Sequence, residues 1–328
     1  MRVGITYDLR DDYLALGLGE EAIAEFDQLE TIDAIDRTLQ DLGYHTDRIG
    51  NVRSVIARLA CGDRWDLVFN IAEGLSGYGR EAQVPSLLDA YQIPYTFSDP
   101  LSLAMTLHKG MAKRVVRDSG IPTPDFMVVK SARDMARLDL PFPLFAKPIA
   151  EGTGKGVSAA SRLSNHHELV THCTRLLSEY RQPVIVESFL PGREFTVGIV
   201  GTDDEARAVG IMEVILKDQA EQHSYSYLNK KRFEEVVEYR PVLGKDAEQA
   251  IEIALAAWRV LECRDGGRLD LRADAQGRIH FLEANPLPGL HPDHSDLPIL
   301  CAMSRISYQE LIAWIMESAM RRVSVSPQ

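Results

Sequence analysis

The chain has 328 residues, of which 45% are hydrophobic and 26% charged, and its formal net charge is −12 at pH 7. This length favours two or three compact units, and the excess of acidic residues argues against a nucleic-acid-binding protein, which needs a basic face. The chain lacks a signal-peptide pattern and any apolar run long enough to span a bilayer, so a cytoplasmic protein without membrane partners is expected. The four scattered cysteines predict reduced thiols.

The first hundred residues alternate between strand patterns and helix patterns. In the longest helix pattern, Leu29, Ile32, Ile35 and Leu39 recur at three- and four-residue spacing, and Gly43 follows as a C-cap glycine. Strands that alternate with helices predict a parallel sheet. The strands are expected at residues 2–7, 65–70 and 93–96, and the helices at residues 27–42, 52–59 and 82–91.

After a junction at residues 98–100 the pattern changes. A helix is expected over residues 101–119, followed by a rigid extended segment at residues 121–124. Short strands with glycine-containing connections then predominate, which predicts an α+β section that does not repeat the first unit. The strands are expected at residues 145–147, 184–187, 195–200, 208–215, 268–272 and 279–283, and the helices at residues 165–180, 245–261 and 307–320.

Two hairpin-like strands near the C-terminal end carry the strongest chemical signal. Asp270 lies on the first of them, and Glu283 and Asn285 lie two residues apart, hence on one face, at the end of the second. Carboxylate and amide oxygens are ligands that suit Mg²⁺. Arg268 shares the face of Asp270, where its guanidinium would neutralise charge on a phosphoryl group during transfer. The alternative is an edge hairpin with a solvated ion pair, and the string Leu-Glu-Ala-Asn-Pro argues against it.

A glycine-rich loop follows the strand that delivers Lys147. Residues 151–156 contain three glycines and Thr153, so their backbone N–H groups can approach phosphates. The G-x-x-x-x-G-K-[ST] pattern of a P-loop is absent from this segment. The alternative is an ordinary turn, and the nearby lysine and the downstream carboxylates favour a phosphate loop.

A third segment, residues 184–194, runs from an apolar strand into a Pro-Gly turn with Glu187 and Glu194 beside it. The end of such a strand can offer backbone hydrogen bonds to a flat base, while carboxylates accept hydrogen bonds from ribose hydroxyls or an amino group. Taken alone, this segment is more often just a strand and a turn.

These three segments, in this order and spacing, resemble the ATP-grasp family, and more closely its D-alanine–D-alanine ligases. Residues 74–83, 107–113 and 225–230 add to the resemblance, which covers roughly residues 65–320. It implies an α/β and α+β ATP-grasp fold in three parts: an N-terminal α/β domain (1–100), a central domain (101–192) and a C-terminal domain (193–328).

The resemblance also implies a role for each matching residue. Those at the ATP would be Lys109 and Lys147 on the phosphates, Glu151, Gly152, Thr153, Gly154 and Gly156 in the loop that closes over them, Glu187 and Leu190 at the adenine, and Glu194 at the ribose. Those at the reaction centre would be Asp270, Glu283 and Asn285 on two Mg²⁺ ions (Mn²⁺ being an alternative), Arg268 on the transferring phosphoryl group, Lys230 and Tyr225 from a mobile loop, and Gly289 at the oxyanion.

The implied reaction joins small amino acid or peptide substrates. A carboxylate attacks the γ-phosphate of ATP and becomes an acyl phosphate, which an amine then attacks to form the amide. Because an acyl phosphate hydrolyses in water, a lid is required, and the polar stretch 222–231 suits that role. A homodimer is expected only by resemblance.

The chain departs from the family on the substrate side. Glu73 stands where the ligases have a histidine, and the loop reads Glu-Gly-Thr-Gly-Lys-Gly in place of a serine-rich segment. The N-terminal acid that would hold the first substrate could be Glu25, Asp27 or Glu30. His291 and His294 precede Asp296 in a loop that forms either a metal site or, more often for such spacing, a polar surface.

Three functions are therefore open: a D-alanine ligase, an amino acid or dipeptide ligase of a specialised pathway, and a non-catalytic ATP-binding protein. Glu73 favours the second, and the presence of every catalytic residue disfavours the third. A dinucleotide-binding oxidoreductase is disfavoured because no G-x-G-x-x-G follows the first strand.

Overall fold

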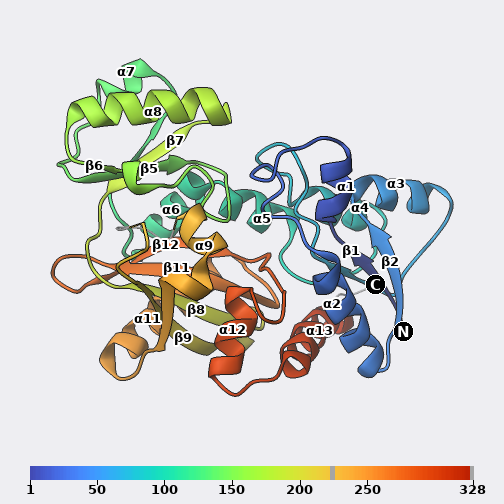
Figure 1. Ribbon diagram of the computed structural model, residues 1–328. Coiled ribbons are helices and arrows are strands. Elements are labelled where there is room, and N and C mark those ends of the chain that lie inside the picture. The colour runs from blue at the N-terminus through green and yellow to red at the C-terminus, as the bar shows by residue number, and fades with distance from the viewer. Residues whose placement is uncertain (222–225, 326–328) are drawn as a thin grey trace.

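The computed structural model describes residues 1–221 and 226–325, which form three sheets in three parts (Figure 1). The first sheet is parallel, whereas the other two are antiparallel, so the expected combination of an α/β unit with an α+β section is confirmed. No helix in the described residues has the length and apolar composition needed to cross a membrane.

The N-terminal part is built on a three-stranded parallel sheet in the order β2-β1-β3. Strand β2 was not predicted because only Ile49 of its six residues is buried. Residues 93–96 do not form a strand of this sheet, apart from an isolated bridge between Val68 and Tyr95. The elements are β1 (Arg2–Thr6), β2 (His45–Gly50), β3 (Leu67–Asn70), α1 (Arg10–Ala15), α2 (Leu29–Asp41), α3 (Val52–Ala60) and α4 (Gln83–Ala90).

The predicted single helix over residues 101–119 is wrong, because the chain breaks into α5 (Pro100–Leu107) and α6 (Lys109–Asp118). His108 between them leaves the helical region, with φ −85° and ψ 88°, and its ring nitrogen accepts a hydrogen bond from the Met111 N–H at 3.2 Å. The ring therefore acts as an N-cap. The break places Lys109 at the start of a new helix, beside the glycine-rich loop.

The central part is a four-stranded antiparallel sheet in the order β4-β7-β5-β6, covered by α8 (Figure 1). Leu169, Cys173 and Leu176 on one side of α8 pack in a common apolar cluster with the buried side chains of the strands. The elements are β4 (Phe126–Val129), α7 (Ala132–Met135), β5 (Leu144–Pro148), a short 3₁₀ turn at Ala159–Ser161, β6 (Arg162–Leu163), α8 (His166–Tyr180) and β7 (Val184–Ser188).

The third part is a five-stranded antiparallel sheet in the order β10-β9-β8-β11-β12. Helix α11 packs against one face through Trp258, and α12 packs against the other through Leu297 and Leu300. The elements are β8 (Glu194–Val200), a 3₁₀ turn at Asp203–Glu205, β9 (Arg207–Leu216), α9 (Tyr227–Lys231), α10 (Phe233–Val236), β10 (Val237–Pro241), α11 (Lys245–Val260), β11 (Gly266–Ala273), β12 (Ile279–Asn285), α12 (Asp296–Met303) and α13 (Tyr308–Val325).

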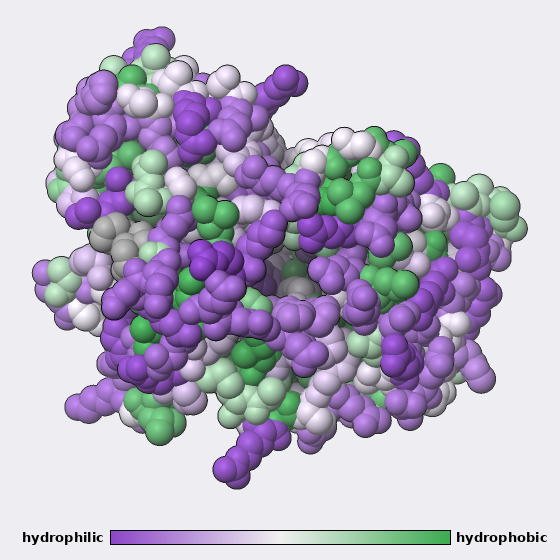
Figure 2. Space-filling view, in the orientation of Figure 1, coloured by the Kyte–Doolittle hydropathy of each residue, from purple (hydrophilic) through white to green (hydrophobic). Residues whose placement is uncertain are grey.

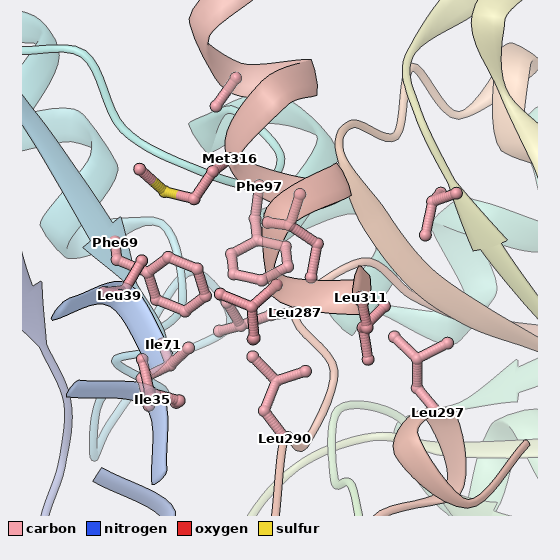
Figure 3. Packing of buried hydrophobic residues seen from close by; sticks show 14 of the residues in the cluster. Ile35, Leu39, Phe69, Ile71, Phe97, Leu287, Leu290, Leu297, Leu311 and Met316 are labelled. Carbon is pink, nitrogen blue, oxygen red and sulfur yellow. The ribbon is translucent and has the colours of Figure 1, made fainter. Parts of the chain in front are cut away.

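A shared apolar core joins the N-terminal part to the C-terminal helices (Figure 3). Leu39 of α2 and Phe69 of β3 pack in it with Leu311 and Met316 of α13. Full burial of each such side chain stabilises the folded state by roughly 1.5–3 kcal/mol. The first and third sheets are thereby held together, and the residues that face the space between them have defined positions.

Candidate active site

Two adjoining cavities occupy the junction of the three parts. The first lies between the four-stranded and five-stranded sheets. The second, of about 350 Å³, extends from there to the N-terminal part. Figure 2 shows a hollow bordered by hydrophilic residues near the centre of the molecule's face. Lys109, Glu151, Lys230, Glu283 and Asp296 line both cavities.

The structure brings the predicted metal ligands together on the last two strands of the third sheet. Asp270 lies directly opposite Glu283, and Arg268 opposite Asn285, in the antiparallel ladder between β11 and β12. The Thr196 hydroxyl donates to one Asp270 oxygen at 2.9 Å, and the Asn285 amide lies 3.3 Å from the other. Two carboxylates and an amide therefore form one polar face.

Cations surround Glu283. The Lys147 Nζ lies 3.3 Å and the Lys109 Nζ 3.7 Å from the same Glu283 oxygen. Burial opposes ionisation of Glu283, but Lys147, Lys109, Lys230 and Arg268 hold its pKa well below the usual range. Glu283 is thus ionised at neutral pH and is suited to receive a cation, while the lysines are suited to receive phosphate oxygens.

A buried ion pair that the sequence did not reveal supports the lysine of the first cavity. Lys113 is fully buried, and its Nζ lies 3.0 Å from one Glu187 oxygen, while Lys147 lies 3.6 Å from the other. Burial lowers the pKa of Lys113 to about 8. Glu187 lines the first cavity as predicted, but its carboxylate is already engaged by the two lysines. In the sequence, only the place of Lys113 within residues 107–113, a segment that resembles the ligases, pointed to a role for this residue.

Hydrogen bonds join the glycine-rich loop to the start of α6 and to the N-terminal part. The Lys109 Nζ donates to the Glu151 carbonyl at 2.6 Å, and the Gly152 N–H donates to the Glu25 carboxylate. Gly152 and Thr153 line the second cavity, and Gly154 the first.

Gly156 lines neither of these cavities. It has φ +73°, and a Cβ there would lie 2.5 Å from Pro148 Cγ. Gly156 therefore packs closely against Pro148 at the end of β5.

The far end of the first cavity holds the residues predicted for adenine and ribose. Leu190 and Glu194 line it, and Glu194 pairs with Arg272 at 3.1 Å. Phe189 also lines it, with Phe145 stacked at 6.4 Å between ring centroids and the Arg272 guanidinium 5.4 Å from its ring. An aromatic wall of this kind suits a flat base, and the sequence pattern had not singled it out.

Of the four predicted catalytic residues, Arg268, Lys230 and Gly289 lie within the described part of the chain. Lys230 lies in α9 and lines both cavities, and Gly289 lines the second. Arg268 pairs with Asp296, with 3.3 Å between Nε and the carboxylate. Tyr225 and most of the first half of the predicted lid fall at residues 222–225, outside the described residues.

Acidic side chains converge on the second cavity from the N-terminal part. Asp8, at the end of β1, accepts a hydrogen bond from the Gly74 N–H through its carboxylate at 2.8 Å and from the Asp27 N–H through its carbonyl at 3.1 Å. It thereby holds Asp27 and Glu73 near each other. Burial raises the pKa of Asp27 to about 8 and that of Glu81 to about 7, and the pKa of Glu73 lies well above its usual range.

Of the three N-terminal acids considered for the first substrate, Glu25 and Asp27 line the second cavity and Glu30 does not. Glu25 accepts from Arg80 at 2.9 Å and from Lys155 at 3.3 Å, in addition to the Gly152 N–H. This buried network anchors the glycine-rich loop to the N-terminal part. Burial raises the pKa of Glu25, but the charges of Arg80 and Lys155 more than offset this, so its pKa is lowered.

These raised pKa values predict a pH dependence of stability. Asp27 and Glu81 bind protons more tightly in the folded protein than in the unfolded chain, so the free energy of unfolding falls as pH rises through about 7 and 8. Asp8 is the charged neighbour that adds to the effect of burial on Asp27. The Asp27→Asn variant should show a smaller loss between pH 6.5 and 8.5 in urea unfolding. An equal loss in the variant would contradict the assignment.

The turn that brings Glu73 and Glu81 together depends on Gly74. Its φ is +71°, and a Cβ there would lie 2.5 Å from the Arg80 carbonyl oxygen. Gly74→Ala should lower the free energy of unfolding by about 3 kcal/mol, from backbone strain and the clash. Gly77→Ala is the matched control, since φ is +93° but nothing lies within 4 Å, and should cost about 1 kcal/mol. Equal losses in urea titrations would refute the packing argument.

His291 and His294 lie with ring centroids 4.4 Å apart, and the His291 Nδ1 accepts from the Asp293 N–H at 3.2 Å. Within residues 1–221 and 226–325, no three His, Cys, Asp or Glu side chains are grouped so as to hold a metal ion. The loop is thus a polar wall of the second cavity, and the metal alternative gains no support. The face at Asp270 offers two carboxylates with an amide, which suits a metal that also binds phosphate oxygens.

Known proteins resemble the chain over most of its length. Residues 115–317 match the family described as the D-ala D-ala ligase C-terminus. An uncharacterised protein, y4sG, of Sinorhizobium fredii is 30% identical over 78% of this chain and 75% of its own. The D-alanine–D-alanine ligase of Bordetella petrii is 31% identical over 88% of this chain and 83% of its own. The crystal structure of D-alanine–D-alanine ligase from Bacillus anthracis complexed with ATP covers 99% of both chains with a TM-score of 0.73 at 22% identity.

Proposed function

The chain belongs to the D-alanine–D-alanine ligase family and is an ATP-grasp ligase that forms carbon–nitrogen bonds, and we propose that it joins two amino acids, or an amino acid and a peptide, at the junction of the two cavities. The fold likeness to the solved ligases supports the ATP-grasp assignment. ATP drives the reaction, and ADP and phosphate are its other products.

One observation carries the proposal. Asp270 and Glu283 lie opposite each other where the two cavities meet. The positive charges of Lys109, Lys147 and Arg268 act on Glu283. Carboxylates for a metal and cations for phosphate oxygens are thus combined at one place. A phosphoryl group that is transferred from a nucleotide in the first cavity to a substrate in the second would lie beside these carboxylates and cations during the transfer.

Asp270, Glu283 and Asn285 fit Mg²⁺, because they supply hard oxygen ligands and leave room for phosphate oxygens and water. We propose two ions, with Mn²⁺ as an alternative metal. Bound there, the metal would neutralise charge on the phosphates of ATP.

The chain's own residues would then bind the phosphates, stabilise the transferring phosphoryl group and exclude water. Lys109 and Lys147 bind phosphate oxygens, and Arg268 stabilises the phosphoryl group as one oxygen of the substrate carboxylate attacks it and ADP leaves. The amine of the second substrate attacks the resulting acyl phosphate, phosphate departs, and the amide remains. Lys230 and the segment around it close over the site and exclude water.

Several finer features are also proposals. Domain boundaries after residues 100 and 192 agree with the separation of the three sheets, whose strands end at Asn70, span Phe126–Ser188 and begin again at Glu194. A cytoplasmic location suits an enzyme that consumes ATP. A homodimer is proposed by family likeness alone.

A ligase with substrates other than D-alanine is the second candidate. It is favoured by Glu73, which places an additional carboxylate in the second cavity. A non-catalytic ATP-binding protein is the least supported reading, because Arg268, Lys230 and the carboxylates of the metal face are all retained.

The test is ADP release from Mg²⁺-ATP against a panel of single and paired D- and L-amino acids. Release with D-alanine alone would support a D-alanine ligase, and release only with another pair would support the second candidate. Absence of release with every pair, together with tight ATP binding, would favour the non-catalytic reading and contradict the proposal.

A further inference from the structure

The second cavity contains more carboxylates than its own cations neutralise. Glu25 pairs with Arg80 and Lys155, and Glu283 pairs with Lys109 and Lys147. Three further acids line the same cavity, and no described residue forms an ion pair or a side-chain hydrogen bond with any of them. They are Asp27, Glu73 and Glu81.

The other cations that line the cavity act on other carboxylates, and the charge of Lys230 acts on Asp270 and Glu283. Arg268 pairs with Asp296, and Lys231 pairs with Glu20 at 3.0 Å. The charge of Arg10 acts on Glu20. The charge of Arg80 acts on Glu73 and Glu81, and that of Lys109 acts on Glu81 as well. The Arg80 guanidinium also donates to the Ala150 carbonyl at 2.8 Å, in addition to its bond with Glu25. One guanidinium therefore serves several carboxylates.

Glu81 is the acid of this group that is best placed to receive a cationic ligand. Its side chain is only 9% exposed, it lines the second cavity, and it accepts no hydrogen bond from any residue in the described part of the chain. The Glu81 oxygens are not among the enclosed polar atoms that lack a partner, so they are accessible from the cavity, where a donor group of a ligand can reach them. Burial, with repulsion from neighbouring carboxylates, raises the pKa of both Glu81 and Glu73, and the charge of Arg80 offsets only part of the rise.

The reacting groups alone do not balance these acids. Two amino acid substrates bring at most two α-ammonium groups, and the one that attacks must first lose a proton. With Glu25 already paired, burial makes these three acids hold protons near neutral pH, and they ionise when a cation binds beside them. One α-ammonium group offers a single positive charge for three such carboxyl groups, whereas a basic side chain adds a second.

Resting on the proposed function, we propose that one of the two amino acids joined by this protein is basic, and that Asp27, Glu73 and Glu81 bind its side-chain ammonium or guanidinium group. The substrate class is thus a diamino acid or a guanidino acid. Its carboxylate or its α-amino group reacts at the Arg268 end of the cavity, while its cationic end lies against the N-terminal part.

The test compares pairs of amino acids that have the same number of carbon atoms but differ in charge: lysine with norleucine, ornithine with norvaline, arginine with citrulline and 2,3-diaminopropionate with alanine. ADP release by the full-length protein with Mg²⁺-ATP should have a kcat/KM at least about 10-fold higher for the basic member of at least one pair. Equal or greater use of the neutral members would overturn the inference.

Two variants locate the effect. Glu81→Gln and Glu73→Gln should each lower the kcat/KM for the basic amino acid at least about 10-fold more than the kcat/KM for its neutral partner. Glu252→Gln, on the exposed face of α11, removes the same charge away from the cavity and should leave the preference unchanged. An unchanged preference in both cavity variants would contradict the assignment.

Binding can be judged separately from catalysis. At pH 8 the basic amino acid should raise the melting temperature of the wild-type protein more than its neutral partner does, and Glu81→Gln should abolish that difference. A thermal shift without ADP release would support the cation site and refute the ligase reaction. ADP release without a preference for basic substrates would do the reverse.

Discussion

Replacement of Glu283 by glutamine is expected to lower kcat by more than about 100-fold, since even residues that only support metal ligands commonly matter 10–100-fold. The substitution keeps the size of the side chain but removes the negative charge that faces Asp270 and lies within 4 Å of Lys147 and Lys109. The metal face would lose half of its carboxylates. Steady-state ADP release across a range of Mg²⁺ concentrations measures the effect.

The protein should remain folded, because Lys147 keeps Glu187 as a partner and Lys109 keeps the Glu151 carbonyl. Circular dichroism and thermal unfolding are the controls for this. Glu194→Gln is a matched variant at the opposite end of the first cavity, and it should raise the KM for ATP with a smaller effect on kcat. A Glu283→Gln enzyme with wild-type turnover would refute the metal assignment.

Replacement of Arg268 by alanine is expected to lower kcat by about 1,000-fold while changing the affinity for ATP by less than about 10-fold, as for other arginines that act on a phosphoryl group in transfer. The guanidinium lies on β11 two residues from Asp270 and lines the second cavity, whereas it does not line the first, where the nucleotide is expected. Its effect should therefore fall on the reaction rather than on nucleotide binding. Single-turnover rates and direct titration with a nucleotide separate the two.

Loss of Arg268 also leaves Asp296 without its ion pair, so a second comparison is needed. Asp296→Asn should retain most of the activity, and Arg268→Lys should recover only part of it, because an ammonium group lacks the planar fork of a guanidinium. Equal losses of kcat and of nucleotide affinity in Arg268→Ala would make it a binding residue instead.

The strands that the sequence did not predict share one physical feature. β2, β4, β6 and β10 all lie at the edges of their sheets. These four edge strands have few buried residues, so their sequences lack a long apolar run or strict alternation. The edge strand β3, whose four residues are all buried, and the edge strand β12 were predicted. The inner strands, such as β8 and β11, were predicted because both of their faces are covered. The break at His108 was missed for a different reason: it depends on a single side-chain cap, and Gly110 lies just inside the second helix rather than at the break.

The same distinction applies to the site. Asp270, Glu283 and Asn285 could be placed on one face because their spacing on strands determines it. Contacts such as that of Glu25 with Gly152, 127 residues apart, or with Arg80, 55 residues apart, depend on how distant segments pack. No local pattern reports such contacts, and the same holds for the burial of Lys113 beneath Glu187.

The proposed reaction requires that a substrate carboxylate is activated by phosphorylation before the amide forms. The most direct measurement uses the amino acid that supports ADP release, labelled with ¹⁸O in its carboxylate, and follows the label by mass spectrometry. One ¹⁸O atom should appear in the phosphate released for each amide formed. Amide formation with unlabelled phosphate, or hydrolysis of ATP without transfer of the label, would contradict it.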